Sequence, residues 1–575
     1  MLRKNNNQEI SAIFEEIASF LEMDGVAFKP RAYRRVAAVL KDLDQDVFII
    51  YNKGGEKALD SIPGVGTAIA AKIIEYIKTG SIKYWKKLQK TRPIALNELL
   101  RIEGLGPRRI RILYEKLGIK NLKDLEKAIA KKKIAPLFGF GIKTEENIKQ
   151  AIIFLKRSRG RFLLGEILPF TKRFLDAIKK LKEVKEIKVA GSIRRRKQTI
   201  GDIDFLVISE HPLKVMSFFV NMADVEKVWA HGLSKSSVRM KQGFDVDLRI
   251  MSAASYGAAL QYFTGSKMHN IKTRRIAIKK GWRLNEYGLF KGKKRIAGHN
   301  EKEIYEKLGM RYIEPELRED RGEIQAAFLN KLPVLVSQAD IKGDLHSHSN
   351  WNGGYNSISE MAEKAISLGY EYLGISDHTE TLRIENGLTE RQLITQRREI
   401  NSLNIGFKAL GLNFKVLQGC EANILLDGSL DISDKALSNL DYAIAGIHSH
   451  MKMSKRDMTK RIIKAIKNPY IRIISHPTGR ILKKRKEYEI DFAKILRISL
   501  QMKKVLEINS APRRLDLDDE KIKMAKEAGI KMVINSDAHQ KENLSQIKYG
   551  IFQARRGWAE KKDIINTRSI DNLFN

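Results

Sequence analysis

The feature that most constrains the fold is a series of short apolar, β-branched runs after residue 340, most of which are followed by histidine or aspartate. The runs "YLGIS", "YAIAGI", "IRIIS" and "MVIN" have the length and composition of buried strands. They alternate with stretches typical of helices, which predicts an α/β layered or barrel domain over residues 340–575. The carboxyl ends of the strands in such a barrel meet at one mouth, so the polar side chains that follow them would come together.

The residues at these predicted strand ends are the types that bind transition metals. Imidazole and carboxylate together suit Zn²⁺ or Mn²⁺. A single histidine is usually structural, but the repetition at separate strand ends favours a metal site. The candidate ligands are His346, His348, His378, Glu421, His448, His476, Asp537 and His539. His450 is expected to support these ligands by contacting them from outside the metal site. Cys420, the one cysteine, is expected to pack within its strand.

A second site is predicted from "VAGSIRRRKQTIGDIDFLVIS", residues 189–209. Asp202 and Asp204 alternate along an apolar strand, so they project from the same face and would repel each other unless a cation lies between them. "FDVDLRI" adds Asp245 and Asp247 on another strand. Such carboxylates suit Mg²⁺, and the preceding basic turn suits a triphosphate. The alternative is a pair of edge-strand aspartates that face solvent.

The N-terminal part, to about residue 155, has the apolar spacing of helices and repeats one glycine-containing turn. Segments 61–77 and 101–117 share the plan, and segment 137–152 is a looser third copy. Each turn precedes a helix, so its N–H groups would bind a DNA backbone phosphate without reading the bases. The alternative is a plain glycine-capped turn between helices. The predicted phosphate-binding glycines are Gly64, Gly66, Gly104 and Gly106.

The charge balance favours nucleic acid as the partner. Lys and Arg (106) outnumber Asp and Glu (68), which gives a net charge of +38 and a pI of about 9.9. Solvated lysines on helix faces are the alternative explanation. No apolar run is long enough to predict a membrane-spanning helix. A chain with one cysteine fits the reducing cytoplasm, and a monomer is the default expectation.

The aspartate strands also carry a family resemblance. "GSIRRR…GDIDFLV", "DVDLRI", "YFTGSKMHNIKTR" and "GWRLNEYGLF" follow in this order and resemble the palm and thumb of family X DNA polymerases, over roughly residues 1–318. The resemblance implies that Asp202, Asp204 and Asp247 bind Mg²⁺ and that Arg249 pairs with these carboxylates. By the same resemblance Asp245 is a neighbour rather than a ligand.

The resemblance also implies residues that contact the nucleotide and the DNA. Ser192 and Arg195 would bind the β- and γ-phosphates, Asn270 the edge of the incoming base, and Arg274 the template strand. The remaining implied nucleotide contacts are Gly191, Gly201, Tyr262, Phe263, Thr264 and Gly265, of which the last four would line the sugar pocket.

Lys72 matches the lysine that opens abasic sugars through a Schiff base in the lyase region of that family. This chemistry requires a lysine with a lowered pKa. Ala68 replaces a phosphate-binding lysine that is common in the animal enzymes. Two expectations therefore remain for Lys72, lyase activity or a contact with the DNA backbone.

The C-terminal part resembles the PHP (polymerase and histidinol phosphatase) domain, a distorted β/α barrel with a trinuclear metal centre that hydrolyses phosphoesters. The implied ligand sets are His346, His348, Glu421 and Asp537; Glu421, His448 and His476; and His378 with His539. In "HSHSNWNGG", Gly353 replaces an aspartate that helps to hold the third metal. That site is therefore expected to bind its ion more weakly.

Together these features predict a multidomain protein with helical hairpin-rich N-terminal domains, an α+β nucleotidyltransferase palm and thumb, and a C-terminal PHP barrel. The predicted boundaries are 1–85 for the lyase-like domain, 86–158 for the fingers, 159–250 for the palm, 251–318 for the thumb, 319–339 for a linker and 340–575 for the PHP domain.

The predicted function is DNA-directed DNA synthesis with dNTPs at gapped or primer–template DNA, as in base-excision repair. The PHP domain would add metal-dependent 3′-5′ exonuclease or abasic-site phosphoesterase activity. Three alternatives are a template-independent nucleotidyltransferase, a non-enzymatic DNA-binding scaffold and a hydrolase of small phosphoesters. The last of these would leave the basic charge and the hairpins without a purpose.

Overall fold

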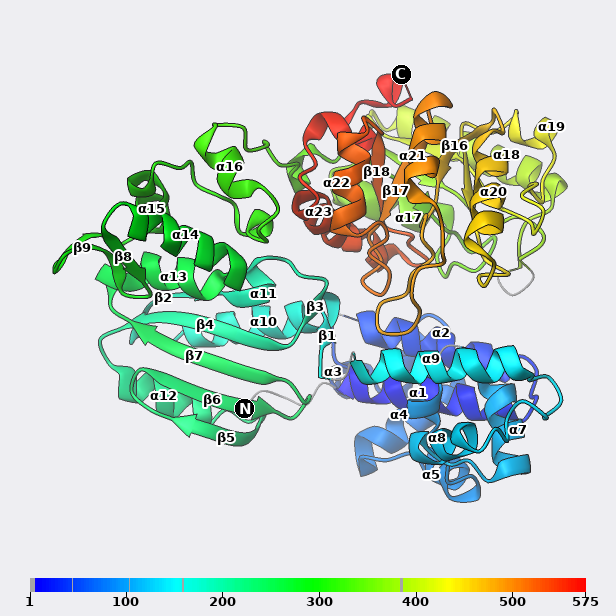
Figure 1. Cartoon of the computed structure of the whole chain (residues 1–575). Coiled ribbons are helices and arrows are strands. Elements are labelled where there is room, and N and C mark those ends of the chain that lie inside the picture. Colours follow the sequence, from blue (N-terminus) through cyan, green and yellow to red (C-terminus); the bar gives the residue numbers. More distant parts are fainter. Residues whose placement is uncertain (1–5, 44, 103, 158–159, 383–385, 575) are drawn as a thin grey trace. The chain divides into compact units, whose positions relative to one another are not determined.

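The computed structural model describes residues 6–43, 45–102, 104–157, 160–382 and 386–574. The chain divides into two compact units, residues 1–159 with 483–485, and residues 160–482 with 486–575 (Figure 1). The predicted boundary between fingers and palm, at 158–159, lies outside the described residues. No helix in the described part is long and apolar enough to cross a membrane.

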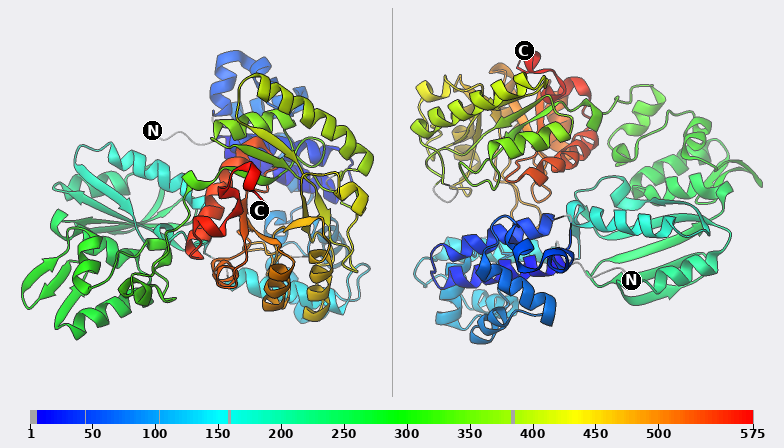
Figure 2. Two further views of the ribbon diagram at one scale, coloured as in Figure 1. Left: turned by 90° about the horizontal axis from the view of Figure 1, so that it is seen from above. Right: turned by 180° about the vertical axis from the view of Figure 1, so that it is seen from behind.

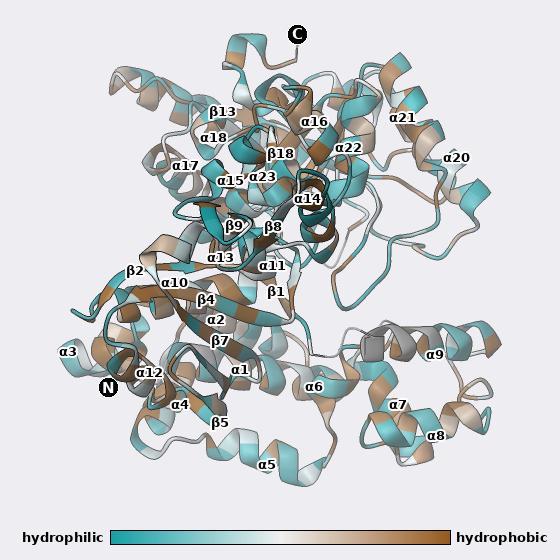
Figure 3. Ribbon diagram, turned by 60° about the vertical axis from the view of Figure 1, so that its left-hand side comes forward, coloured by the Kyte–Doolittle hydropathy of each residue, from teal (hydrophilic) through white to brown (hydrophobic). Residues whose placement is uncertain are grey.

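The regular elements of residues 6–157 are all helices in the described part of the chain. Apolar side chains at 3-and-4 spacing, such as Ile10, Phe14 and Ile17 of its first helix, are buried in one of two apolar cores. Helix α5, which is rich in lysine, is mainly hydrophilic (Figure 3). The helices are α1 (Asn6–Met23), α2 (Lys29–Asp42), α3 (Val47–Asp60), α4 (Thr67–Thr79), α5 (Lys83–Thr91), α6 (Leu96–Leu99), α7 (Pro107–Leu117), α8 (Leu122–Ala130) and α9 (Ile142–Arg157).

The second unit begins with a five-stranded sheet in the order β2-β4-β7-β6-β5 (Figure 1). Ile203, Phe205 and Val207 alternate along β4 and pack with residues of α10 and α12 in one core, which leaves the aspartates on the opposite face. The elements are β1 (Phe162–Leu163), α10 (Leu164–Lys179), β2 (Val184–Val189), α11 (Gly191–Arg194), β3 (Thr199–Ile200), β4 (Asp202–Ser209), α12 (Pro212–Val220), β5 (Val225–His231), β6 (Lys235–Met240) and β7 (Asp245–Met251).

The segment predicted to be the thumb combines helices with a three-stranded antiparallel sheet, β10-β9-β8. Residues 319–339, predicted to be a linker, include helix α16, and its Ile324 and Ala327 are buried in the core of this region. The elements are α13 (Tyr256–Thr264), α14 (Lys267–Lys279), β8 (Trp282–Asn285), β9 (Gly288–Lys291), β10 (Lys294–Ala297), α15 (Glu301–Leu308) and α16 (Glu323–Phe328).

The C-terminal region is a distorted parallel α/β barrel, as the sequence predicts. Its strands form two sheets, β11-β12-β13 and β14-β15-β16-β17-β18, and single bridges join His378 to Glu421 and Ser347 to Ala538. The strands are β11 (Gly343–Ser347), β12 (Tyr372–Ile375), β13 (Lys415–Gln418), β14 (Glu421–Asn423), β15 (Ala443–Gly446), β16 (Ile471–Ile474), β17 (Val505–Asn509) and β18 (Met532–Asn535).

Helices lie on the outside of these strands in both views of Figure 2. The apolar runs of the strands are buried between them, because residues of parallel strands face helices or the barrel interior rather than water. Cys420 is fully buried in this core, but it lies between β13 and β14 rather than within a strand. The helices are α17 (Ile358–Ser367), α18 (Glu390–Ala409), α19 (Asp434–Leu437), α20 (Lys455–Ile466), α21 (Phe492–Gln501), α22 (Asp519–Glu527) and α23 (Ile547–Arg556).

Candidate active sites

The predicted metal ligands of the C-terminal barrel gather at one end of its strands. His346 is in β11, and His378, His448 and His476 follow β12, β15 and β16 by two or three residues. These strands are parallel, so their carboxyl ends lie at the same mouth. The fold thereby brings together side chains that are far apart in the sequence.

Glu421 lies at the centre of this cluster. Its Oε1 is 3.0 Å from His476 Nε2 and 3.2 Å from His448 Nε2. Its Oε2 is 3.1 Å from both His346 Nε2 and His378 Nδ1. A buried carboxylate with two imidazoles at each oxygen has the arrangement of a ligand that bridges two metal ions.

Asp537 forms the second acidic corner of the cluster. Its Oδ1 lies 3.5 Å from His348 Nε2, 3.7 Å from His539 Nδ1 and 3.8 Å from His346 Nε2. Three groups of three side chains have ligand atoms within 4.8 Å of one another: His346, His348 and Asp537; His378, Glu421 and His448; and His348, His378 and His539.

The histidine ring atoms that face this cluster lack other partners. His346 Nε2, His378 Nδ1 and His448 Nε2 are buried and have no hydrogen-bond partner in the described part of the chain, and the same holds for both ring nitrogens of His348. Burying such atoms unpaired is costly. The donor set therefore fits metal ions, and the described histidine–carboxylate groups support metal binding by this domain.

The electrostatics of the cluster favour an ionised Glu421. Burial alone would raise the pKa of this carboxyl, but the neighbouring His346, His448 and His378 hold it well below its usual value. Burial by itself would lower the pKa of His346, yet Glu507 and Glu421 raise it well above the ordinary value. The surrounding imidazoles therefore keep the buried Glu421 side chain ionised.

Several residues that the sequence analysis did not identify hold the ligands in place. His346 Nδ1 lies 2.6 Å from Glu507 Oε1, and His448 Nδ1 lies 2.7 Å from Asn423 Oδ1, so the opposite nitrogen of each ring faces the cluster. Asn509 Nδ2 donates to Asp537 Oδ2 at 3.0 Å. The run "VLEINS" carried a signal for Glu507 and Asn509, because it is apolar and ends in polar residues like the other strands.

Two details differ from the expectations. His450 was expected behind the ligands, but it is exposed, and no described hydrogen bond or ion pair joins its ring to the cluster. The third group contains His348 in addition to His378 and His539. Beside Gly353, the Asn352 side chain is buried, with an Oδ1 that has no partner in the described part of the chain.

The predicted polymerase aspartates lie on one face of the five-stranded sheet. Strands β4 and β7 are parallel, and their register pairs Asp202 with Asp245 and Asp204 with Asp247. These residues therefore project side by side from adjacent strands. The three predicted ligands, Asp202, Asp204 and Asp247, are not among the groups of side chains whose ligand atoms lie within 4.8 Å of one another in the described part of the chain.

Asp247 and Asp245 have different surroundings. Asp247 contacts Lys235 Nζ at 2.7 Å and accepts from Ser237 Oγ at 2.6 Å, and Arg249 Nη2 lies 3.4 Å away. Both oxygens of Asp245 instead accept from Arg239, at 2.6 and 2.9 Å. Because Arg239 engages Asp245 through two parallel bonds, Asp245 is less available to a metal.

Among the aspartates of β4 and β7, Asp204 has a raised pKa, so a nearby cation would favour its ionised form. Burial raises its pKa to about 7, and the charges of Asp202 and Asp247 act in the same direction. A Mg²⁺ ion between these carboxylates would remove this penalty. The donor set of oxygen atoms fits such an ion.

The turn between β2 and β3 closely approaches these aspartates. Gly191 has φ +61°, and a Cβ at this position would lie 2.6 Å from Asp204 Oδ2. Ser192 Oγ is buried and has no hydrogen-bond partner in the described residues. Arg195 Nε donates to Glu319 at 3.0 Å, and its Nη1 donates to the carbonyl of Thr264.

The other predicted nucleotide contacts lie around helices α13 and α14. The rings of Tyr262 and Phe263 meet edge to face, and Arg249 lies over the Phe263 ring at 4.4 Å. Asn270 Nδ2 donates to the Tyr262 carbonyl at 2.6 Å, and Arg274 lies 5.7 Å from the Tyr262 ring. Gly265 ends α13, and Gly201 separates β3 from β4. Their contacts with a nucleotide remain predictions.

The two glycine hairpins of the first unit have the same geometry. Gly64 and Gly104 have φ values of +81° and +88°, and Gly66 and Gly106 are the N-caps of α4 and α7. Neither cap has a side-chain hydrogen bond, so N–H groups in the first turn of both helices are left for another acceptor; in α7 they begin at Arg108, because Pro107 has none. This is the arrangement that binds an anion.

Lys72, on α4, has the lowered pKa that lyase chemistry requires. Burial lowers it, Glu75 opposes that shift, and Lys29 adds to it. The ammonium lies 6.0 Å from the Tyr33 ring and 5.6 Å from the Tyr84 ring, and it donates to the Ala68 carbonyl at 2.9 Å.

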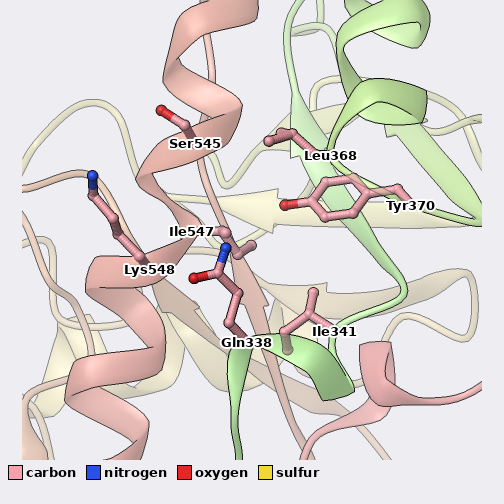
Figure 4. Close-up of a pocket in the computed structure, with 7 residues that line it drawn as sticks. All are labelled: Gln338, Ile341, Leu368, Tyr370, Ser545, Ile547 and Lys548. Carbon is pink, nitrogen blue, oxygen red and sulfur yellow. The ribbon is translucent and has the colours of Figure 1, made fainter.

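A separate small pocket of about 180 Å³ lies in the barrel domain (Figure 4). It shares no residue with the histidine cluster, and it is smaller than typical ligand pockets. Its lining residues are Gln338, Ile341, Leu368, Tyr370, Ser545, Ile547 and Lys548.

The fold and the two sites define a nucleotidyltransferase of the polymerase type joined to a PHP domain. The sequence matches the families described as helix-hairpin-helix domain, SAM-like helix-hairpin-helix tandem, DNA polymerase beta thumb and PHP domain, over residues 5–82, 96–152, 259–319 and 344–511 respectively. The chain is 36% identical to the DNA polymerase/3′-5′ exonuclease PolX of Bacillus subtilis (strain 168), over 99% of this chain and 98% of that protein. It therefore belongs to the bacterial PolX family of family X DNA polymerases.

A second set of proteins matches about a third of this chain. A probable phosphatase of Caldicellulosiruptor bescii is 32% identical over 35% of this chain and 82% of that protein. A probable phosphatase of Thermoanaerobacter sp. (strain X514) is 28% identical over 39% of this chain and 89% of that protein.

Proposed function

We propose that this protein fills short gaps in DNA by adding dNTPs to a primer 3′-hydroxyl and shortens 3′ ends at its PHP site. The observation that carries the proposal is the presence in one chain of two separate acidic sites, the aspartates on β4 and β7 and the cluster around Glu421. A monomer in the cytoplasm, acting on gapped or primer–template DNA in base-excision repair, fits this activity.

In DNA synthesis, Asp202, Asp204 and Asp247 would hold Mg²⁺. When bound, Mg²⁺ would lower the pKa of the 3′-hydroxyl and offset the charge of the leaving pyrophosphate. Ser192 Oγ and the Arg195 guanidinium would bind and orient the triphosphate from the turn next to these aspartates. Lys235 and Arg249 would hold the Asp247 side chain in place.

In hydrolysis, the eight ligands of the barrel would hold Mn²⁺ or Zn²⁺, which would supply a water molecule of lowered pKa. Glu507 and Asn423 orient His346 and His448 through the ring nitrogens that face away from the cluster. The third group, built on three histidines without the aspartate that Gly353 replaces, would bind its ion more weakly than the other two.

The test is extension of a primer on a duplex with a one-nucleotide gap, with dNTPs and either Mg²⁺ or Mn²⁺. We expect insertion of the templated nucleotide and, without dNTPs, Mn²⁺-dependent shortening of the 3′ end. Equal extension of a single strand would instead indicate a template-independent transferase. Absence of both reactions would favour the DNA-binding scaffold.

The hairpins can be tested without disturbing the fold. A Cβ at Gly66 or Gly106 would meet no protein atom within 4 Å, but it would stand where a phosphate approaches the free N–H groups. We expect Gly106→Ala to weaken binding to gapped DNA about tenfold, the loss of a hydrogen bond to a charged group, with an unchanged melting temperature. Unchanged affinity, measured by fluorescence anisotropy, would show a plain structural turn.

Lyase activity is a second candidate function, and the lowered pKa of Lys72 between two tyrosine rings favours it. Borohydride should trap the wild-type protein on DNA with a 5′-deoxyribose phosphate, whereas Lys72→Ala should lose at least about 90% of the trapped product because the nucleophile is missing. Trapping that survives in Lys72→Ala would leave Lys72 only a contact with the DNA backbone.

A further inference from the structure

The turn that carries Ser192 and Arg195 is in direct contact with helix α23 of the C-terminal barrel. Arg556, the last residue of α23, donates from Nη1 to the Arg195 carbonyl at 2.7 Å and to Glu319 Oε1 at 3.1 Å. The same Glu319 oxygen accepts from Arg195 Nε at 3.0 Å. One carboxylate oxygen therefore joins an arginine of the barrel to an arginine of the polymerase region.

This contact is buried and its charges are paired. The Arg556 side chain is 1% exposed, and the Glu319 side chain is 12% exposed. Lys197 Nζ lies 3.5 Å from Glu319 Oε2, and Asp519 accepts from both Arg556 Nη2 and Arg321 Nη2. Removing one partner of such a network leaves an uncompensated buried charge, so the arrangement tolerates little displacement.

Glu319 is ionised because of these cations. Burial alone would raise its pKa, but Arg556, Arg195 and Lys197 together hold the pKa below its usual value. Loss of Arg556 would remove the first of these favourable charges and would leave Glu319 more strongly dependent on Arg195. Glu319 would then lack the second arginine that fixes its position, so the Arg195 guanidinium that bonds to it would lose its defined orientation toward a substrate.

The barrel also contacts the residues that follow Arg195. The Arg196 guanidinium lies 4.2 Å from the centre of the Phe552 ring of α23. Arg480 Nη2 donates to Gln198 Oε1 at 2.6 Å. The barrel thus contacts this turn at three points: the Arg195 carbonyl, the Arg196 guanidinium and the Gln198 side chain.

Two of the three nitrogen atoms of the Arg195 guanidinium are already engaged. Nε donates to Glu319 and Nη1 to the Thr264 carbonyl, whereas Nη2 has no hydrogen-bond partner in the described part of the chain. Two fixed donors set the plane of the guanidinium and leave the third for a ligand.

We propose that Arg556 is a positioning residue for nucleotide binding, so that a residue of the exonuclease-type barrel sets the affinity of the polymerase site for dNTPs. Arg556 acts through Glu319 and the Arg195 carbonyl and does not touch the nucleotide. The inference rests on the proposed role of Arg195 in binding the triphosphate.

The test is steady-state gap filling by the full-length protein with Arg556→Ala, Arg556→Lys and Arg195→Ala. Arg556→Ala should raise the KM for dNTP about tenfold, as expected for a lost hydrogen bond to a charged group, and change kcat less than about twofold. The 3′-5′ exonuclease rate of the same preparation should stay the same. Arg556→Lys, which keeps the charge, should recover part of the affinity.

Arg555→Ala is the matched control. Arg555 precedes Arg556 on α23, but it donates to Glu316 at 2.8 Å and to the Val336 carbonyl at 3.2 Å. No described hydrogen bond joins it to the turn that carries Ser192 and Arg195. It should leave the KM for dNTP unchanged. Combining Arg556→Ala with Glu319→Gln should raise KM no further than the more severe single change, because both act on Arg195.

The outcomes separate this inference from the assignment on which it rests. If Arg195→Ala raises the KM for dNTP and neither Arg556 variant does, the positioning role is wrong and the triphosphate role of Arg195 stands. If Arg195→Ala leaves KM unchanged, both are wrong. Equal losses of synthesis and exonuclease activity in Arg556→Ala, without recovery in Arg556→Lys, would show a purely structural role and overturn the proposal.

Discussion

Replacing Asp204 with asparagine is expected to lower templated primer extension by about 10³-fold or more, because the metal would lose a ligand worth several kcal/mol of transition-state stabilisation. The neutral amide also removes the buried carboxylate whose pKa burial and the charges of Asp202 and Asp247 raise to about 7. Shortening of 3′ ends should persist, since the ligands of the barrel are unchanged. Gap filling and exonuclease assays on one preparation would measure both effects.

Asp245→Asn is the control for this prediction. Asp245 is paired with Asp202 in the register of β4 and β7, but both of its oxygens accept from Arg239. Its replacement should change extension only a few-fold, the effect of weakening a partly exposed ion pair. Equal losses in Asp245→Asn and Asp204→Asn would contradict the assignment of Asp204 as a metal ligand.

The raised pKa of Asp204 also gives the direction of a pH effect. Below about pH 7 this carboxyl binds a proton, and the proton competes with Mg²⁺. The Mg²⁺ concentration that gives half-maximal extension should therefore increase as the pH falls through this value.

The second large effect is expected at Glu421. Glu421→Gln should reduce Mn²⁺-dependent shortening of 3′ ends by about 10³-fold, because this one carboxylate lies within 3.2 Å of His346, His378, His448 and His476. Primer extension should be unaffected. The number of Mn²⁺ ions bound per chain, measured by elemental analysis, should also fall.

His450→Ala is the control, because His450 follows the same strand as His448 but is exposed. It should keep both the bound metal and the exonuclease rate. If Glu421→Gln retains wild-type metal content and exonuclease activity, the cluster is not the hydrolytic site.

Much of the functional chemistry was readable in the chain itself. The alternation of Asp202 and Asp204 in an apolar run requires a shared face, because side chains of a strand alternate with a period of two. The apolar runs that end in histidine or aspartate predicted the parallel strands of the barrel and the ligands at their ends. These are local patterns, and they depend on spacing rather than on distant contacts.

The tertiary structure decided which residues support these local patterns. The partners of His346 and Arg195 illustrate this: Glu507 and Arg556 are separated from them by 161 and 361 residues. The sequence determined the residue types and local geometry of both sites, because strand and turn periodicities are set by the backbone. Only the fold determined which histidine nitrogens face the metal cluster, which ion pairs form, and that α23 contacts the turn carrying Ser192 and Arg195. Burial and proximity between distant segments exist only once the chain has packed.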